Sequence, residues 1–182
     1  MMINDNIPSN EELGEKTRKL VLAIKEALIN RGEMMATAES CTGGLIASSI
    51  VNEAGSSAVL SGGVVAYQNE IKEKLLGVPH HILESYGAVS EQTVKAMAEG
   101  VRSRMDCQWA VSTSGIAGPG GAVPGKPVGF VWMCVTNGLQ NEAFSEIFTG
   151  NRHEIREKAV YRVLSRLLFS INNQKSTCTK EH

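Results

Sequence analysis

The sequence offers little from which a metal site, a disulfide-bonded fold or a membrane span could be built. Its four cysteines, Cys41, Cys107, Cys134 and Cys178, are widely and irregularly spaced, without the close pair that builds a zinc site or a redox motif. No apolar run approaches the ~20 residues of a membrane span, and the polar, acidic start of the chain lacks the basic segment and apolar stretch of a secretory signal. We therefore expect a cytoplasmic protein with reduced thiols, no membrane contact, no metal and no other cofactor.

Neither sign of charge predominates in the composition. Lysine and arginine together number 18, and aspartate and glutamate number 19, which gives a net charge of −1 at pH 7. A nearly neutral chain has no overall field that would attract nucleic acid or an acidic membrane surface, so we expect neither as a partner. Any anionic ligand would have to be held by a few local groups.

Apolar periodicity predicts one α/β domain. With 182 residues, 42% of them hydrophobic, the chain fits a single core better than two small ones. Short apolar runs predict strands at residues 34–38, 59–67, 108–112, 128–136 and 143–148. Helical spacing predicts helices at 16–31, after 44, at 70–76, from 91 to about 105 and at 152–171. This alternation favours a single-domain, three-layer α/β/α architecture with a mixed, mostly parallel sheet.

The ends of the chain and several turns are also predicted from local composition. Residues 1–14 and 173–182 are polar and without periodicity, so we expect mobile tails on either side of a domain at 15–172. Ser90 and Asn69 are expected to cap helices, and Asn137-Gly138 is a turn signal that predicts a hairpin.

The first candidate site is the segment Ser40-Cys41-Thr42-Gly43-Gly44, where a predicted strand turns into a helix. A hydroxyl at that position meets unpaired backbone N–H groups and the positive end of the helix dipole, which can hold an oxyanion or a phosphate. Alternatively, Ser40 or Thr42 simply caps the helix, since serine and threonine are preferred caps.

A serine nucleophile needs a base, and histidine is poorly placed to supply one. His80 and His81 are adjacent, so they point in different directions and are expected to be solvated surface residues. A lysine of lowered pKa can replace histidine. Lys72 falls in the first turn of a predicted helix, where the dipole disfavours an ammonium, and Tyr67 lies just before that helix. The alternative is an exposed helix lysine and a strand tyrosine.

A second glycine-rich segment, residues 114–121, follows a predicted buried strand. Its glycines permit a backbone nest that presents several N–H donors to an anion. It is not a P-loop, because no Lys-Ser or Lys-Thr follows at the required spacing, and it runs on to Lys126-Pro127 instead of opening a dinucleotide-binding helix. A flexible surface loop is the alternative reading.

Six short segments, taken together and in order, resemble the CinA C-terminal domain family between about residues 20 and 168. They are AESCTGG at 38–44, AGSS at 54–57, YQNEIK at 67–72, GAVSE at 87–91, SGIAGP at 114–119 and KPVG at 126–129. The resemblance implies an amidohydrolase that converts nicotinamide mononucleotide to nicotinic acid mononucleotide and ammonia in pyridine nucleotide salvage. It also implies a serine nucleophile assisted by lysine and tyrosine, which fall on Ser40, Lys72 and Tyr67, and a homo-oligomer.

The expected substrate is a small nucleotide, and its carboxamide and phosphate need separate binding groups. We expect the oxyanion and phosphate sites among the two glycine-rich segments, Asn69 and the first residue of the last helix; the candidates are Thr42, Gly43, Gly44, Asn69, Ser114, Gly115, Ile116, Ala117, Gly118 and Arg152. Cys41 is an alternative nucleophile. A non-catalytic nucleotide-binding or regulatory module, and an amidase for another small amide, are the alternative functions.

Two features qualify what the resemblance implies. The family associates a metal-dependent ADP-ribose pyrophosphatase activity with an additional N-terminal domain that is not part of this sequence, so neither that activity nor its metal is expected. Gly62 stands where many stand-alone relatives carry arginine, and this difference beside Tyr67 is expected to alter substrate affinity or lower activity.

Overall fold

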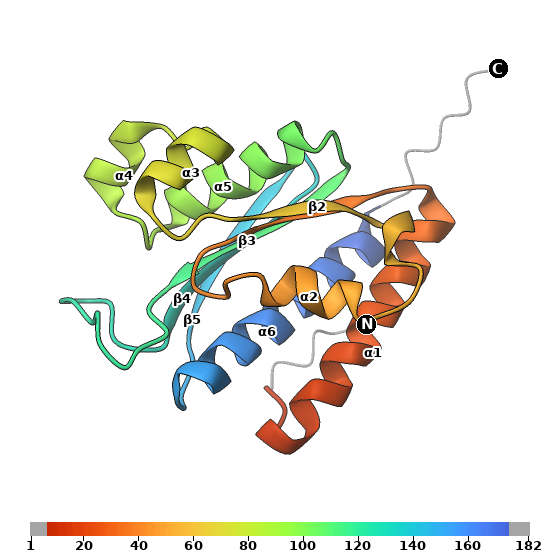
Figure 1. Ribbon diagram of the computed structural model, residues 1–182, viewed down its shortest axis with the longest axis horizontal. Helices are drawn as coiled ribbons and strands as arrows, with labels where there is room; N and C mark the ends of the chain where they lie inside the picture. The colour runs from red at the N-terminus through yellow and green to blue at the C-terminus, as the bar shows by residue number, and fades with distance from the viewer. Residues whose placement is uncertain (1–6, 175–182) are drawn as a thin grey trace.

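The computed structural model describes residues 7–174 and has a central five-stranded sheet of order β2-β1-β3-β4-β5 (Figure 1). The strands are β1 (Met35–Glu39), β2 (Leu60–Val65), β3 (Trp109–Gly115), β4 (Phe130–Thr136) and β5 (Asn141–Ile147). β1 pairs in parallel with β2 and β3, whereas β4 pairs antiparallel with both β3 and β5. Four of the five strands therefore run in one direction, and the predicted mixed, mostly parallel sheet is confirmed.

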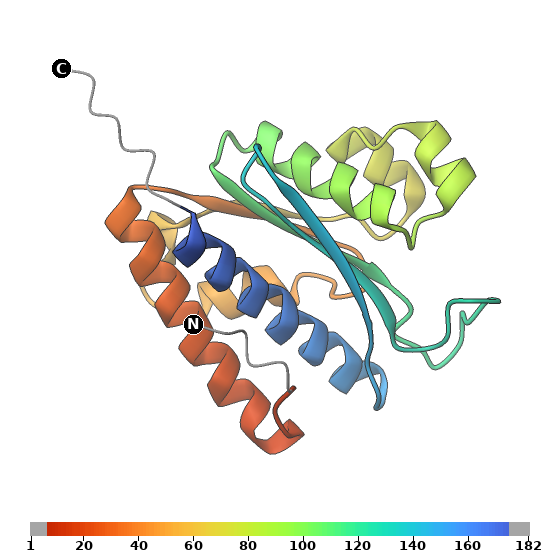
Figure 2. The ribbon, with the colours of Figure 1, turned by 180° about the vertical axis from the view of Figure 1, so that it is seen from behind.

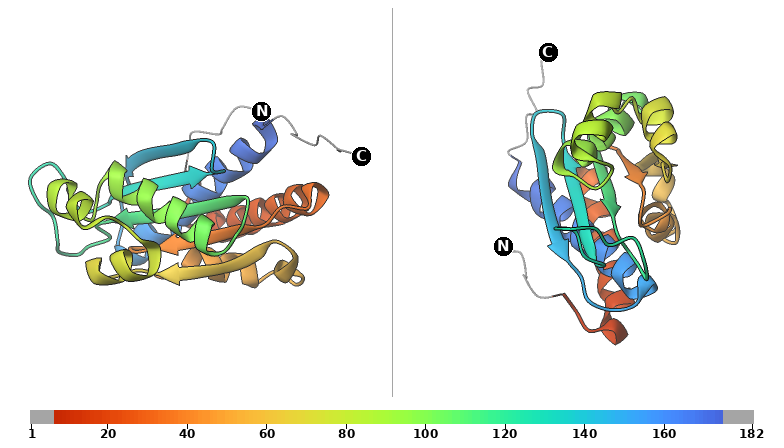
Figure 3. Two further views of the ribbon diagram at one scale, coloured as in Figure 1. Left: turned by 90° about the horizontal axis from the view of Figure 1, so that it is seen from above. Right: turned by 90° about the vertical axis from the view of Figure 1, so that its left-hand side faces the viewer.

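Helices cover both faces of the sheet and complete the predicted three layers. On one face lie α1 (Asn10–Arg31), α2 (Leu45–Val51) and α6 (Arg152–Asn173), and on the other lie α3 (Asn69–Leu76), α4 (His80–Tyr86) and α5 (Glu91–Arg104), as Figures 2 and 3 show. A short 3-10 helix spans Ser56–Ala58. None of these helices, within the described part of the chain, is long and apolar enough to cross a membrane.

The central strand β1 is buried on both faces, which explains its uninterrupted run of small and apolar residues. Its side chains alternate between two cores. Met35 packs with the helices α1, α2 and α6, whereas Ala36 and Ala38 pack with residues of α3, α4 and α5. The last side chain of β1, Glu39, is 1% exposed and shares the face of Met35.

Several predicted boundaries move in the structure. α1 begins at Asn10, so residues 10–14 are helical and not part of a tail; Leu13 is buried, and two glutamates in the first turn favour the helix dipole. α6 runs to Asn173; residues 7–9 and 174 of the predicted tails are neither helix nor strand, and residues 1–6 and 175–182 lie outside the described residues. Gln68, not Asn69, is the residue before α3. Ser90 caps α5 as predicted, accepting from the Thr93 N–H.

Helix α4 was absent from the predicted elements. It holds seven residues, too few for a visible helical period, and begins beside Pro79 with two polar histidines. Leu83 is buried in the α3–α5 core, so tertiary packing supplies what the local sequence does not indicate.

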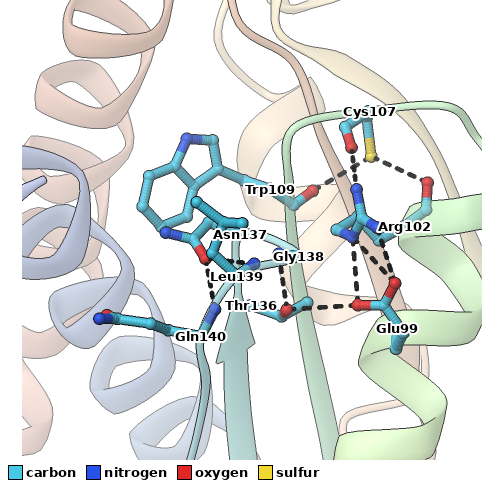
Figure 4. Close-up of polar contacts among 9 residues, drawn as sticks. All are labelled: Glu99, Arg102, Cys107, Trp109, Thr136, Asn137, Gly138, Leu139 and Gln140. Atoms are coloured by element: carbon cyan, nitrogen blue, oxygen red, sulfur yellow. Dashed lines mark hydrogen bonds and ion pairs between the residues drawn. The ribbon is translucent and has the colours of Figure 1, made fainter. Parts of the chain in front are cut away.

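The β4–β5 hairpin turn lies at the end of the sheet where β3 begins (Figure 4). The Asn137 side chain accepts from the N–H groups of Leu139 and Gln140 at 3.0 and 2.8 Å, which fixes the predicted turn. Thr136 accepts from the Gly138 N–H at 3.0 Å and donates to Glu99 of α5. These contacts join the hairpin to α5 at the start of β3, away from the carboxyl end of that strand.

Two glycines inside helices give a direct test of the α3–α5 packing. A Cβ at Gly100 of α5 would overlap the Leu76 carbonyl oxygen of α3, whereas a Cβ at Gly14 of α1 would meet nothing within 4 Å. We expect Gly100→Ala to lower the free energy of unfolding by about 1–3 kcal/mol through overpacking, and Gly14→Ala to raise it by about 0.5–1 kcal/mol through helix propensity. Urea unfolding measures both, and equal responses would contradict this packing.

Candidate active site

The parallel strands β2, β1 and β3 end at one edge of the sheet, and the predicted site residues follow them there. Ser40 comes directly after β1, Tyr67 comes two residues after β2, and Ser114 lies near the end of β3. The Ser40 N–H donates to the Thr113 carbonyl at 3.0 Å and the Ala66 N–H donates to the Glu39 carbonyl at 2.8 Å, which extends the pairing beyond the strands. Carboxyl ends of parallel strands are the usual place for ligands in α/β folds.

A cavity of about 190 Å³ lies at this edge; it is lined by Ser40, Cys41, Tyr67, Lys72, Ala88, Val89, Ser114, Gly115, Ala117 and Arg152. Two larger cavities, of about 310 and 340 Å³, lie among α1, α2 and α6 and beside the β4–β5 turn. Neither larger cavity contains the serine, lysine and tyrosine singled out by the sequence. We therefore place the candidate chemistry in the smaller cavity.

Lys72 is the buried cation of this cavity. Its side chain is 1% exposed, and its Nζ donates to the Tyr67 carbonyl at 3.1 Å. Burial lowers the pKa of Lys72, because an ammonium loses its hydration inside the protein, while the neighbouring Cys41 acts in the opposite direction. The alternative of an exposed helix lysine is therefore excluded, and a neutral amine becomes accessible at alkaline pH.

Cys41 lines the same cavity but is a poor nucleophile. Its side chain is 6% exposed, and burial raises the pKa of its thiol to about 12. The thiolate is the reactive form of cysteine, so almost none is present near neutral pH. Ser40, 8% exposed, lines the same cavity as Lys72.

Arg152 and Tyr67 form the outer wall of the cavity. Tyr67 is 59% exposed, and its hydroxyl accepts from Arg152 Nη2 at 3.1 Å. Arg152 Nη1 donates to the Gly118 carbonyl at 2.6 Å. Among residues 7–174 no carboxylate pairs with Arg152, so its positive charge at the cavity is not neutralised by the protein.

Glu39 and Arg156 belong to this region, although the sequence patterns did not single them out. The Glu39 carboxylate accepts hydrogen bonds from the N–H groups at the start of α2, whereas the sequence predicted Ser40 or Thr42 as the helix cap. Arg156 Nε donates to the Cys41 carbonyl at 3.1 Å and its Nη2 donates to the Thr42 carbonyl at 2.7 Å. Arg156 could have been found in the sequence because it lies one helical turn after Arg152. Glu39 could have been suspected only because it precedes Ser40.

The structure brings only part of the predicted set to the cavity. Seven predicted residues line it, namely Ser40, Tyr67, Lys72, Ser114, Gly115, Ala117 and Arg152. The others, Thr42, Gly43, Gly44, Asn69, Ile116 and Gly118, lie outside its lining. Thr42 is fully buried, the Gly44 N–H donates to Glu39 at 2.9 Å, and the Ile116 N–H donates to the Phe130 carbonyl at 2.9 Å. The Thr42 hydroxyl and the N–H groups of Gly44 and Ile116 are thus hydrogen-bonded within the protein.

Gly62 lies away from the cavity. It pairs with Ala36 near the start of β2, and a Cβ there would come within 3.2 Å of the Met105 sulfur after α5. Five residues of extended chain, at ~3.3 Å each, separate it from Tyr67. Within one chain, Gly62 therefore makes no direct contribution to the cavity lining.

Comparison with known proteins now identifies the family. The CinA C-terminal domain matches residues 17–171. The chain belongs to the CinA family. A CinA-like protein of Synechococcus sp. (strain CC9902) is 41% identical over 171 residues, covering 88% of this chain and 41% of that protein, and one of Prochlorococcus marinus (strain NATL2A) is 44% identical over 164 residues, covering 89% and 36%. The chain thus spans about two fifths of the length of these curated relatives.

Solved structures of CinA-family proteins share the fold over nearly their whole length. Competence damage-inducible protein A (ComA) from Klebsiella pneumoniae subsp. pneumoniae MGH 78578 is 34% identical with a TM-score of 0.85, covering 87% of this chain and 99% of that one. CihA from Agrobacterium tumefaciens, a competence/damage inducible protein, is 37% identical with a TM-score of 0.81, covering 93% and 99%. The single-domain α/β architecture is therefore that of the CinA family.

The burial of Lys72 predicts a distinctive pH dependence of stability. Its pKa is lower in the folded state than the ~10.4 of an unfolded lysine, so the unfolded state binds more protons between these values and stability rises with pH in that window. The Lys72→Met variant lacks the titrating amine, so its stability does not show this rise with pH. We expect the melting temperature of Lys72→Met, relative to wild type, to fall between pH 7 and pH 10, as measured by thermal unfolding. Lys74→Met, an exposed lysine of the same helix, serves as control, and parallel behaviour of the two variants would contradict the burial argument.

Proposed function

We propose that this chain is an amidohydrolase that converts nicotinamide mononucleotide to nicotinic acid mononucleotide and ammonia. The observation that carries the proposal is the shared cavity of Ser40 and buried Lys72 at the carboxyl end of β1. Membership of the CinA family and the six motifs of the chain support the same activity. Homo-oligomer formation, which the resemblance implies, stays a prediction.

In the proposed mechanism, Ser40 Oγ attacks the carboxamide carbon of the substrate while neutral Lys72 accepts the hydroxyl proton, directly or through Tyr67. The tetrahedral intermediate then collapses, and the carbon–nitrogen bond breaks as the nitrogen takes up a proton and leaves as ammonia. Water attacks the resulting ester, which releases the acid and restores the Ser40 hydroxyl. A low dielectric around Lys72 serves this cycle because it favours the neutral amine.

The oxyanion needs N–H donors that are not already used. The Gly44 N–H already donates to the Glu39 carboxylate, and the Ile116 N–H already donates to the Phe130 carbonyl. We assign the oxyanion to backbone groups at Gly115 and Ala117, which line the cavity beside Ser40. Each such donor typically contributes about 3–4 kcal/mol to the transition state.

The nucleophile is tested by ammonia release from the mononucleotide. We expect Ser40→Ala to lower kcat at least ~10³-fold and Lys72→Met to lower it ~10²–10⁴-fold, because each removes a group from the chemical step. Cys41→Ala should stay close to wild type, since its thiol is held protonated. The rate of wild type should rise toward alkaline pH as Lys72 loses its proton. Full activity in Ser40→Ala would eliminate the serine mechanism.

The phosphate site is tested at Arg152, whose charge has no carboxylate partner among the described residues. We expect Arg152→Gln to raise KM for the mononucleotide about 10- to 100-fold, the effect of losing a charge-assisted hydrogen bond, and to change KM for the phosphate-free riboside little. Arg166→Gln, on the same helix but paired with Glu142 at 2.7 Å, is the matched control. An equal rise for both substrates, or a wild-type preference for the riboside or nicotinamide, would argue against a phosphate site at Arg152.

A further inference from the structure

Glu39, the last residue of β1, accepts hydrogen bonds at both carboxylate oxygens. Oε2 accepts from the Thr42 hydroxyl at 2.7 Å, the Gly44 N–H at 2.9 Å and the Ile46 N–H at 3.1 Å, and Oε1 accepts from the Ala47 N–H at 2.9 Å. Hydrogen bonds to a charged group are the strong ones in proteins, and this group is 1% exposed. The carboxylate thus joins the end of β1 to the turn at 42–44 and to the start of α2.

A second link runs from the same turn to β3. The Thr42 and Thr113 hydroxyls lie 2.7 Å apart, and the Thr113 carbonyl accepts from the Ser40 N–H. β3 therefore fixes the backbone of Ser40 through a hydrogen bond to its N–H. Glu39 and Thr113 fix the following turn through their contacts with Thr42. Arg156 closes the outer side of the turn through the Cys41 and Thr42 carbonyls.

The side chains of Glu39 and Ser40 point to different faces of the sheet. Successive side chains along a strand point to opposite faces, so Glu39 points to α2 while Ser40 lines the cavity beside Lys72 of α3. The carboxylate is consequently not among the groups that line the cavity. Its negative charge acts on the neighbouring Cys41 thiol, and its hydrogen bonds set the conformation of the 40–44 turn.

We propose that Glu39 is a positioning residue that fixes the Ser40 hydroxyl over the cavity by holding the 40–44 turn to the start of α2. The inference rests on the proposed function in taking Ser40 as the nucleophile. It assigns α2 a structural role, because its first N–H groups are committed to Glu39 and not to substrate. Misplacing a reacting group by about 1 Å can lower a rate ~10²-fold, so a loosened turn has a measurable kinetic effect.

The test compares two glutamate-to-glutamine variants at opposite ends of β1. Glu39→Gln keeps the shape of the side chain but places an NH₂ group against N–H donors. Glu33→Gln is the matched control: Glu33 precedes β1 and accepts from Trp109 Nε1 at 2.7 Å and Arg31 Nε at 2.8 Å, at the end of the strand away from the cavity. Ammonia release from nicotinamide mononucleotide gives kcat and KM, and amide hydrogen exchange reports on Gly44, Ile46 and Ala47.

A positioning role predicts a split between the kinetic parameters. We expect kcat of Glu39→Gln to fall about 10- to 100-fold with KM within ~3-fold of wild type, since binding groups are untouched. Glu33→Gln should lose stability but keep kcat. A Glu39→Gln enzyme with wild-type kcat would overturn the inference, as would an equal loss of kcat in the two variants, which would show a general effect of destabilisation.

Hydrogen exchange separates failure of this inference from failure of the proposed function. If wild type releases no ammonia from the mononucleotide, the proposed function fails, and the role of Glu39 is judged on the turn alone. Loss of protection at Gly44, Ile46 and Ala47 in Glu39→Gln, with protection kept in Glu33→Gln, supports it; equal protection in both overturns it. If Glu39→Gln does not fold, Thr113→Val, which removes the hydroxyl contact to Thr42 at nearly constant shape, takes its place with an expected several-fold fall in kcat at unchanged KM.

Discussion

The parallel pairing of β1 with β2 and β3 is the constraint on which the candidate site depends. The register sets Glu39 opposite Val65 on one side and Thr113 on the other, so all three strands end at nearly the same level. The residues that follow them must then meet, although Ser40, Tyr67 and Ser114 are far apart in the chain. Helix α3 starts from the same edge and returns Lys72 to the space that the strand ends enclose.

Two buried, charged side chains at this edge, Glu39 and Lys72, differ in how many hydrogen bonds the protein gives them. The Glu39 carboxylate is surrounded by donors, as a buried charge must be if it is to stabilise the structure. The Lys72 ammonium, equally buried, donates to the Tyr67 carbonyl and has a lowered pKa. The hydrogen bonds of Glu39 stabilise the turn before α2, and the burial of Lys72 supports its proposed role as a base. Perturbed groups of this kind cluster at functional sites.

Sequence patterns predicted the layers, the strands and the turn at Asn137, because these depend on local periodicity and turn chemistry. They missed α4, whose seven residues gain their order from packing, and the start of α1, where Leu13 is buried by contacts beyond the local pattern. In the site, the places of Ser40 and Lys72 at a strand end and in a first helical turn made them candidates, and the family resemblance assigned their roles. Glu39 was not, because a glutamate in a strand shows no sign of its partners until Gly44, Ile46 and Ala47 fold against it.

The central claim is that Ser40 becomes acylated by the nucleotide substrate. Rapid quenching of wild-type enzyme with nicotinamide mononucleotide, followed by mass spectrometry of the proteolytic peptide that contains Ser40 and Cys41, tests it most directly. The account predicts a transient mass increase equal to the nicotinoyl mononucleotide group, located on Ser40 by fragmentation. An adduct located on Cys41, whose pKa is raised to about 12, would contradict the account.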